Sequence, residues 1–157
     1  MENILLIVST TRMSHMSVEH ALRCCRTENK SLKAVFILDN DLPDFIFDKL
    51  TMEGYIGDKP GKIIHDAVMQ TYEIRGRAVI EDICRESTES GVKCDTIFLE
   101  GNFLESCRNI ISGQKIDRVV ITRRKRSILS KFIFGSAIDQ LMKEFKNVIF
   151  EVFEEED

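Results

Sequence analysis

Short apolar runs alternate with amphipathic stretches along this chain. Residues 4–8, ILLIV, form an unbroken apolar run, which is typical of a strand buried on both faces of a parallel sheet. The stretch that follows repeats apolar residues at the i, i+3, i+4, i+7 spacing of one helix face: Val18, Ala21, Leu22 and Cys25. Ser14 stands just before this stretch and is placed to cap the N-terminus of the helix.

The same alternation continues to the end of the chain. Further strands are predicted at residues 32–38, 92–99, 117–122 and 147–153. A long helix is predicted from Lys62 to about Ser90, with a bend at Gly76 and with Gly91 ending it. Residues 40–60 hold both prolines and two glycines, and we expect them to form a connection with little regular structure.

Two shorter helices complete the pattern. One begins after Asn102, which can cap it, and ends at Gly113. The other presents an apolar face made of Ile138, Leu141, Met142 and Phe145. Strands and helices therefore alternate throughout, and this order predicts an α/β fold in a single domain spanning residues 1–157. We expect a five-stranded, mostly parallel, doubly wound sheet with helices on both faces.

In sheets of this kind, ligands bind at the carboxyl ends of the strands, where the strand order reverses. This rule directs attention to two loops, at residues 9–14 and 122–136. The second loop contains four consecutive basic residues at 123–126 and, at its end, Gly135 and Ser136, which open the last predicted helix. A helix N-terminus favours an anion, because its backbone N–H groups lack intrahelical acceptors.

The composition of the chain indicates which kinds of partner and which cellular compartment to expect. The net charge is −4 over 157 residues, which gives no overall attraction to nucleic acid. The longest apolar runs fall well short of the ~20 residues of a membrane span, and the acidic start does not resemble a signal peptide. The five cysteines are odd in number and include no CxxC pair. Free thiols of this kind predict a reducing, cytoplasmic location.

The whole chain resembles the universal stress protein family. Residues 90–121 resemble that family's third strand, third helix and fourth strand, and residues 127–143 resemble the segment that enters its last helix. The resemblance implies a Rossmann-like sheet of the adenine nucleotide alpha hydrolase type and a stress-response role. The family's phosphate motif is Gly, two residues, Gly, nine residues, Gly, then Ser or Thr. Its positions fall here on Thr122, Lys125, Gly135 and Ser136.

The resemblance thus implies a cofactor-binding set at the two loops and the end of the second strand. The candidate positions are Ser9, Thr10, Leu38, Thr122, Arg123, Arg124, Lys125, Arg126, Gly135 and Ser136. Ser9 stands where the family usually has an Asp. Thr122 resists the positive φ that a phosphate-loop glycine supplies, and Lys125 adds bulk where the backbone needs to approach the phosphate. Basic side chains at 123–126 could replace the lost backbone donors, although the same run could be a solvated loop or could contact a polar partner.

Two functional hypotheses follow. The first is a regulatory or stress-response binding protein that is non-catalytic, in which ATP binding is weak or lost and an unidentified protein partner carries the signal. The alternative is an adenine-nucleotide binding protein, for ATP or AMP, that uses basic side chains of the loop in place of glycines and could also hydrolyse ATP slowly. No cofactor is certain on either hypothesis; ATP or another phosphate-containing ligand is the candidate.

The sequence offers little else that carries chemistry. Among the first helix's polar residues, His15 and Glu19 share a face and His20 lies about 100° away from Glu19, with no cysteine or second motif joining them, so no metal site is expected. No Ser, His and Asp set suggests a nucleophile, and catalysis is not expected. The apolar strand at 147–153 is expected at a sheet edge, where it could pair with its copy in a homodimer.

Overall fold

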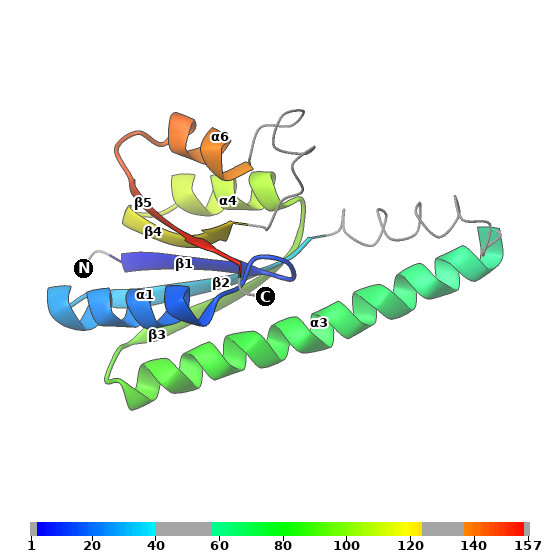
Figure 1. The fold of residues 1–157 in the computed structure, drawn as a ribbon, viewed down its shortest axis with the longest axis horizontal. Coiled ribbons are helices and arrows are strands. Elements are labelled where there is room, and N and C mark those ends of the chain that lie inside the picture. Colours follow the sequence, from blue (N-terminus) through cyan, green and yellow to red (C-terminus); the bar gives the residue numbers. More distant parts are fainter. Residues whose placement is uncertain (1–2, 40–57, 124–136, 156–157) are drawn as a thin grey trace.

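The computed structural model describes residues 3–39, 58–123 and 137–155, which form one sheet with helices on both faces (Figure 1). The strands are β1 (Asn3–Ser9), β2 (Ser31–Asp39), β3 (Cys94–Gly101), β4 (Ile116–Arg123) and β5 (Ile149–Glu154). The helices are α1 (His15–Glu28), α3 (Asp58–Glu89), α4 (Phe103–Ser112) and α6 (Ala137–Glu144). The strand order is β3-β2-β1-β4-β5 and every pairing is parallel, which confirms the predicted doubly wound α/β fold.

Two hydrophobic cores lie on opposite faces of the sheet, because alternate residues of each strand point to opposite sides. On one face, Leu6 and Val120 pack with α1 and the C-terminal half of α3. On the other face, Ile7 and Val119 pack with α4 and α6. Residues 4–9 of β1 are all buried, so the apolar run at the start of the chain is explained by burial on both faces.

The start of α1 follows the sequence closely. Ser14 is the N-cap, and its hydroxyl accepts a hydrogen bond from the Ser17 N–H at 3.0 Å. Asn29 closes the helix in the left-handed conformation, with φ of 54°. The predicted apolar face is confirmed, since all four of its members are buried: Val18, Ala21, Leu22 and Cys25.

One expectation about the middle of the chain is wrong. Helix α3 begins at Asp58 rather than 62, so the last residues of the predicted 40–60 connection are helical. Pro60 does not prevent this, because the first turn of a helix needs no hydrogen bond from its N–H. Gly76, where the sequence predicts a bend, lies inside this helix. A Cβ at Gly76 would lie 2.4 Å from Cε1 of Phe36, so this glycine allows close packing of α3 on β2.

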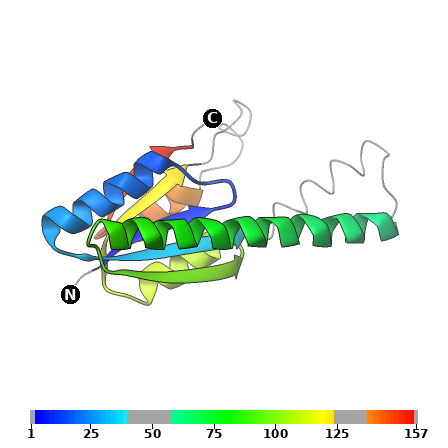
Figure 2. The same ribbon diagram turned by 90° about the horizontal axis from the view of Figure 1, so that it is seen from below.

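Helix α3 is longer than the sheet that it covers (Figures 1 and 2). Its C-terminal half crosses β2 and β3, while its N-terminal half projects beyond the ends of the strands. Gly91, with φ of 73°, turns the chain toward β3, as predicted. Asn102 also acts as predicted, because its side chain accepts from the Glu105 N–H at the start of α4.

Candidate functional site

The strand order reverses between β1 and β4. The chain moves outward from β1 through β2 to β3 on one side, and from β4 to β5 on the other. The carboxyl ends of β1 and β4 are Ser9 and Arg123, and they lie at the same edge because the two strands are parallel. This is the edge where open α/β sheets bind ligands. The two loops singled out from the sequence therefore do start side by side.

Three hydroxyl groups are buried at this edge, and we call them the edge hydroxyls: those of Ser9, Thr10 and Thr122. Ser9 and Thr122 are fully buried. None of the three hydroxyl oxygens has a hydrogen-bond partner within residues 3–39, 58–123 and 137–155. The backbone of Ser9 is paired with Arg12 in a tight turn, with N···O distances of 3.1 and 3.2 Å, so only the side chain is unpaired. A buried hydroxyl without a partner costs free energy, which makes these groups candidates for ligand contacts.

An ion pair that the sequence analysis missed lies beside the edge hydroxyls. Arg12, in the turn after β1, is 3.9 Å from the carboxylate of Asp39 at the end of β2, and both side chains are nearly buried. The guanidinium also lies 3.8 Å from the centre of the Phe103 ring. An arginine after the first strand and an aspartate ending the second were the available signals. Strand pairing was needed to bring the two together.

The other ligand residues predicted from the sequence lie in different surroundings. Arg123 donates to Asp139 of α6 at 3.1 Å, so its charge is already paired. Leu38 is buried in the core on the α1 face, with 1% of its surface exposed. Five further candidates lie outside the described residues: Arg124, Lys125, Arg126, Gly135 and Ser136.

A small pocket opens between the start of α1 and the C-terminal part of α3. Its volume is about 130 Å³, and its lining includes Val8, Ser14, His15 and Asp82. Small-molecule sites commonly measure ~300–1,000 Å³, so the pocket alone suits only part of a ligand. Val8, the residue before Ser9, lines the pocket, whereas none of the edge hydroxyls does.

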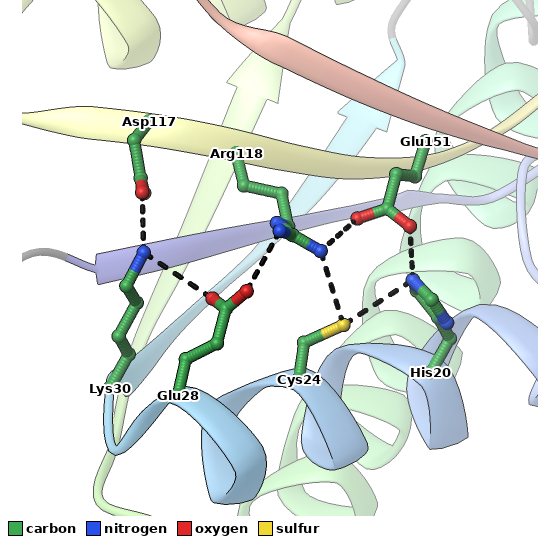
Figure 3. A network of polar contacts seen from close by, with 7 residues as sticks. All are labelled: His20, Cys24, Glu28, Lys30, Asp117, Arg118 and Glu151. Atoms are coloured by element: carbon green, nitrogen blue, oxygen red, sulfur yellow. Dashed lines mark hydrogen bonds and ion pairs between the residues drawn. The ribbon is translucent and has the colours of Figure 1, made fainter.

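A second polar cluster lies between α1 and the strands β4 and β5 (Figure 3), and we call it the α1–β5 network. Its members are His20, Cys24, Glu28, Lys30, Asp117, Arg118 and Glu151. Arg118 is at its centre: it donates to Glu28 at 2.8 Å and to Glu151 at 2.7 Å. Lys30 donates to Asp117 and lies 3.3 Å from the carboxylate of Glu28. Burial alone would raise the pKa of Asp117, but the hydrogen bond and charge of Lys30 lower this pKa overall.

The other end of the network joins His20, Cys24 and Glu151. Nε2 of His20 is hydrogen-bonded to Oε2 of Glu151, and Sγ of Cys24 lies 3.4 Å from the same nitrogen. Sγ is also 3.4 Å from Nη1 of Arg118. Burial and the charge of Glu151 raise the pKa of Cys24, although Arg118 partly opposes them. Contrary to the expectation for the first helix, a cysteine does join His20.

This grouping was only partly visible in the sequence. His20 and Cys24 stand one turn apart on α1, a spacing that places two side chains on one helix face. Glu151 is 131 residues from His20, and only the pairing of β5 with β4 brings it to α1. The ring of Phe153 lies 5.3 Å from that of His20 and packs against it.

Comparison with known proteins identifies the fold. Neither a protein-family model nor a curated protein sequence matches the chain. Solved structures do match over nearly its whole length. Universal stress protein UspA from Lactobacillus plantarum has a TM-score of 0.66 at 11% identity, covering 99% of this chain and 97% of that one. The chain has the universal stress protein fold.

Two further structures support this assignment. A universal stress protein from Archaeoglobus fulgidus has a TM-score of 0.61 at 13% identity, over 99% of this chain and 94% of that one. A universal stress protein solved in complex with cAMP has a TM-score of 0.58 at 10% identity, over 98% and 94% of the two chains. Identities this low establish the shared fold and leave the ligand of the present chain to be argued from its own residues. Within the described ranges, no helix combines the length and hydropathy needed to span a bilayer.

Proposed function

We propose that this universal stress protein-like chain is a non-catalytic regulatory protein that binds a phosphate-containing ligand weakly at the carboxyl edge of its sheet. ATP or a related adenine nucleotide is the candidate ligand. The observation that carries the proposal is the set of edge hydroxyls: Ser9, Thr10 and Thr122 are buried at the strand-order reversal and lack partners among the described residues. A ligand with several oxygen atoms would give these hydroxyls both donors and acceptors.

The expected weakness has two physical reasons. A serine at the end of β1 offers a neutral hydroxyl, whereas a carboxylate there would be a stronger acceptor for ribose or adenine groups. Arg123, which could have neutralised a phosphate, is already paired with Asp139 at 3.1 Å. For Arg123 to bind a phosphate, its ion pair with Asp139 has to be replaced by an ion pair with the ligand. The net gain in binding free energy is therefore small.

Adenine-nucleotide binding with slow hydrolysis is the second candidate. It is favoured by one observation, that a protein of the same fold was solved in complex with cAMP. Geometry among the described residues favours binding without catalysis. Cys24, His20 and Glu151 are the nearest approach to a nucleophile set. Both partners of His20, however, approach the same nitrogen, Nε2, whereas a catalytic triad uses the two ring nitrogens for different partners.

Calorimetry with ATP, adenosine and inorganic phosphate tests the proposal. We expect ATP to bind in the high micromolar range or more weakly, about −5 kcal/mol or less favourably. ATP should bind better than adenosine, and high salt should weaken ATP binding, because exposed charges are screened beyond about 10 Å at 0.1 M. Submicromolar, salt-insensitive binding, or nucleotide released from the purified protein on heating, would overturn the weak-binding proposal and favour the second candidate.

Variants locate the site. Ser9→Ala and Thr122→Val should each weaken ATP binding several-fold. Ser87→Ala is a matched control, since Ser87 is also a fully buried hydroxyl but donates to the Ile83 carbonyl at 2.8 Å within α3. The triple change Ser9→Asp, Thr122→Gly and Lys125→Gly should strengthen ATP binding. Equal effects of the control and the edge variants would mean that the ligand does not contact the edge hydroxyls.

We also propose that β5 mediates a homodimer. A different, unidentified protein would be the partner that the dimer regulates. β5 is the last strand on its side of the described sheet, and Ile149 on it is 55% exposed. Val148, Phe150 and Val152 instead pack against the core on the α4 and α6 face. Light scattering at micromolar concentration should give the mass of a dimer, and Ile149→Glu should give a monomer. A monomeric wild-type chain would contradict the dimer.

A further inference from the structure

We propose that His20, Cys24 and Glu151 form a binding site for a divalent transition-metal ion of the Zn²⁺ class, between helix α1 and the edge strand β5. One ligand atom from each side chain, an imidazole nitrogen, a thiol sulfur and a carboxylate oxygen, lies within 4.8 Å of the other two. These three ligand types are the ones that Zn²⁺ prefers in proteins. This inference is independent of the ligand proposed at the carboxyl edge of the sheet.

The separation of the donor atoms suits tetrahedral coordination. With Zn–S near 2.3 Å and Zn–N near 2.0–2.1 Å, sulfur and nitrogen on one tetrahedral ion lie about 3.6 Å apart. Sγ of Cys24 and Nε2 of His20 are 3.4 Å apart. Nε2 and Oε2 of Glu151 are hydrogen-bonded to each other, so the ion would replace that hydrogen bond as the carboxylate moves outward. A water molecule would complete the fourth position.

The direction in which the donors point distinguishes a metal site from a catalytic one. Cys24 and Glu151 both approach Nε2 of His20, so the three candidate ligand atoms lie together in one small region (Figure 3). A metal ion requires its ligand atoms to be gathered around one position, which the ion then occupies. The two residues on α1 provide a chelating pair one turn apart, and β5 closes the site from the sheet.

The surroundings already contain the contacts that support metal ligands. Arg118 donates to the other carboxylate oxygen of Glu151, Oε1, at 2.7 Å, and its Nη1 lies 3.4 Å from Sγ of Cys24. Hydrogen bonds of this kind to the ligating groups fix their orientation. The Phe153 ring packs against the His20 imidazole, with 5.3 Å between the ring centres.

Charge is also consistent with a bound cation. Glu28, Asp117 and Glu151 contribute three carboxylates to the network, whereas Lys30 and Arg118 contribute two positive charges. These five charged side chains together carry one excess negative charge. Binding a divalent ion with loss of the Cys24 proton adds one positive charge and makes the group neutral. Metal binding should therefore release a proton, and the affinity should rise with pH.

Cobalt titration of the full-length, reduced protein tests the site. One equivalent of Co²⁺ should produce a thiolate-to-cobalt charge-transfer band and the intense visible bands of tetrahedral Co²⁺, and Zn²⁺ should remove both. Cys24→Ser should abolish the charge-transfer band, and His20→Asn and Glu151→Gln should each weaken Zn²⁺ binding at least tenfold. Zn²⁺ should also raise the melting temperature of the wild-type protein.

Two variants serve as matched controls: Cys84→Ser, which removes another partly exposed free thiol, and His65→Asn, which removes a partly exposed histidine. Both should leave cobalt spectra and Zn²⁺ affinity unchanged. The proposal is overturned if the wild-type protein shows no charge-transfer band, if the band survives in Cys24→Ser, or if the controls lose it equally. The cobalt spectrum of the wild-type protein tests the proposal even if a variant does not fold.

Discussion

The α1–β5 network and the edge hydroxyls are both polar groups against the same sheet, but they differ in how their hydrogen-bonding capacity is used. In the network, every one of the seven residues contacts at least one other member, although Oδ1 of Asp117 and Nε of Arg118 have no partner among the described residues. At the edge, three buried hydroxyl oxygens have no partner among the described residues. Paired polar groups hold elements together, whereas unpaired buried ones are costly unless something else binds them.

This difference separates two roles within one fold. The network connects α1 with β4 and β5 and is expected to contribute to stability, with the His20, Cys24 and Glu151 end able to accept an ion. The edge hydroxyls are expected to contribute little to stability and more to ligand binding. Substitutions in the two regions should therefore have opposite consequences for unfolding and for binding.

The largest expected change in unfolding free energy comes from the apolar core beneath these polar groups. Ile7 lies on β1, two residues before Ser9, and is completely buried. Ile7→Ala should lower the free energy of unfolding by roughly 2–5 kcal/mol, because it removes buried methyl groups and leaves a cavity. Chemical denaturation measures this change. A loss below about 1 kcal/mol would show that the central strand is less tightly packed than its burial indicates.

The next effect tests whether the network stabilises the protein. Arg118→Met keeps an apolar stem but removes the arginine cation beside Glu151 and one of the two cations beside Glu28. This change should cost about 1–2 kcal/mol of unfolding free energy. Arg85→Met is the matched control, since Arg85 pairs with Asp82 at 2.8 Å on the exposed face of α3. That change should cost less than about 0.5 kcal/mol. Equal losses in the two variants would remove the distinction between the network and an ordinary surface ion pair.

A smaller effect of opposite sign is expected at the edge. Thr122→Val keeps the side-chain shape and removes a buried hydroxyl, so unfolding free energy should stay constant or rise by up to about 1 kcal/mol. Ser14→Ala, which removes the hydroxyl that caps α1, should instead cost about 1 kcal/mol. Paired denaturation curves check both. Destabilisation by Thr122→Val as large as that by Ser14→Ala would mean that the Thr122 hydroxyl is already satisfied.

The smallest expected effect concerns acid pH. The pKa of Asp117 is lowered in the folded protein, because the pairing with Lys30 outweighs burial. Its stabilisation is therefore present above the unfolded pKa, near 3.9, and is lost as pH falls through the folded pKa. The unfolding free energy of the wild type should exceed that of Asp117→Asn by a few tenths of a kcal/mol at pH 6, since the group is partly exposed. This difference should shrink and then vanish as pH falls through the folded pKa of Asp117. A difference that does not change with pH would exclude the ion pair as its cause.

The sequence by itself determined the order of the elements and most of their bounds. Strands buried on both faces have to be apolar throughout, so β1 and β2 are visible as runs, and β4 and β5 follow the same rule less completely. Local capping signals are equally direct, because Ser14 and Asn102 act on N–H groups only three residues away. These features depend on short-range chemistry, which the order of residues already contains.

Only the tertiary structure decided the polar groupings. Glycine at position 76 has a packing role that its own helix does not reveal, because the neighbour that leaves no room for a Cβ is Phe36 on β2. Arg12 meets Asp39, and His20 meets Glu151, only because parallel pairing places distant strand ends and a crossover helix side by side. Long-range pairing follows from the summed burial of the whole sheet, and no local pattern of residues encodes it.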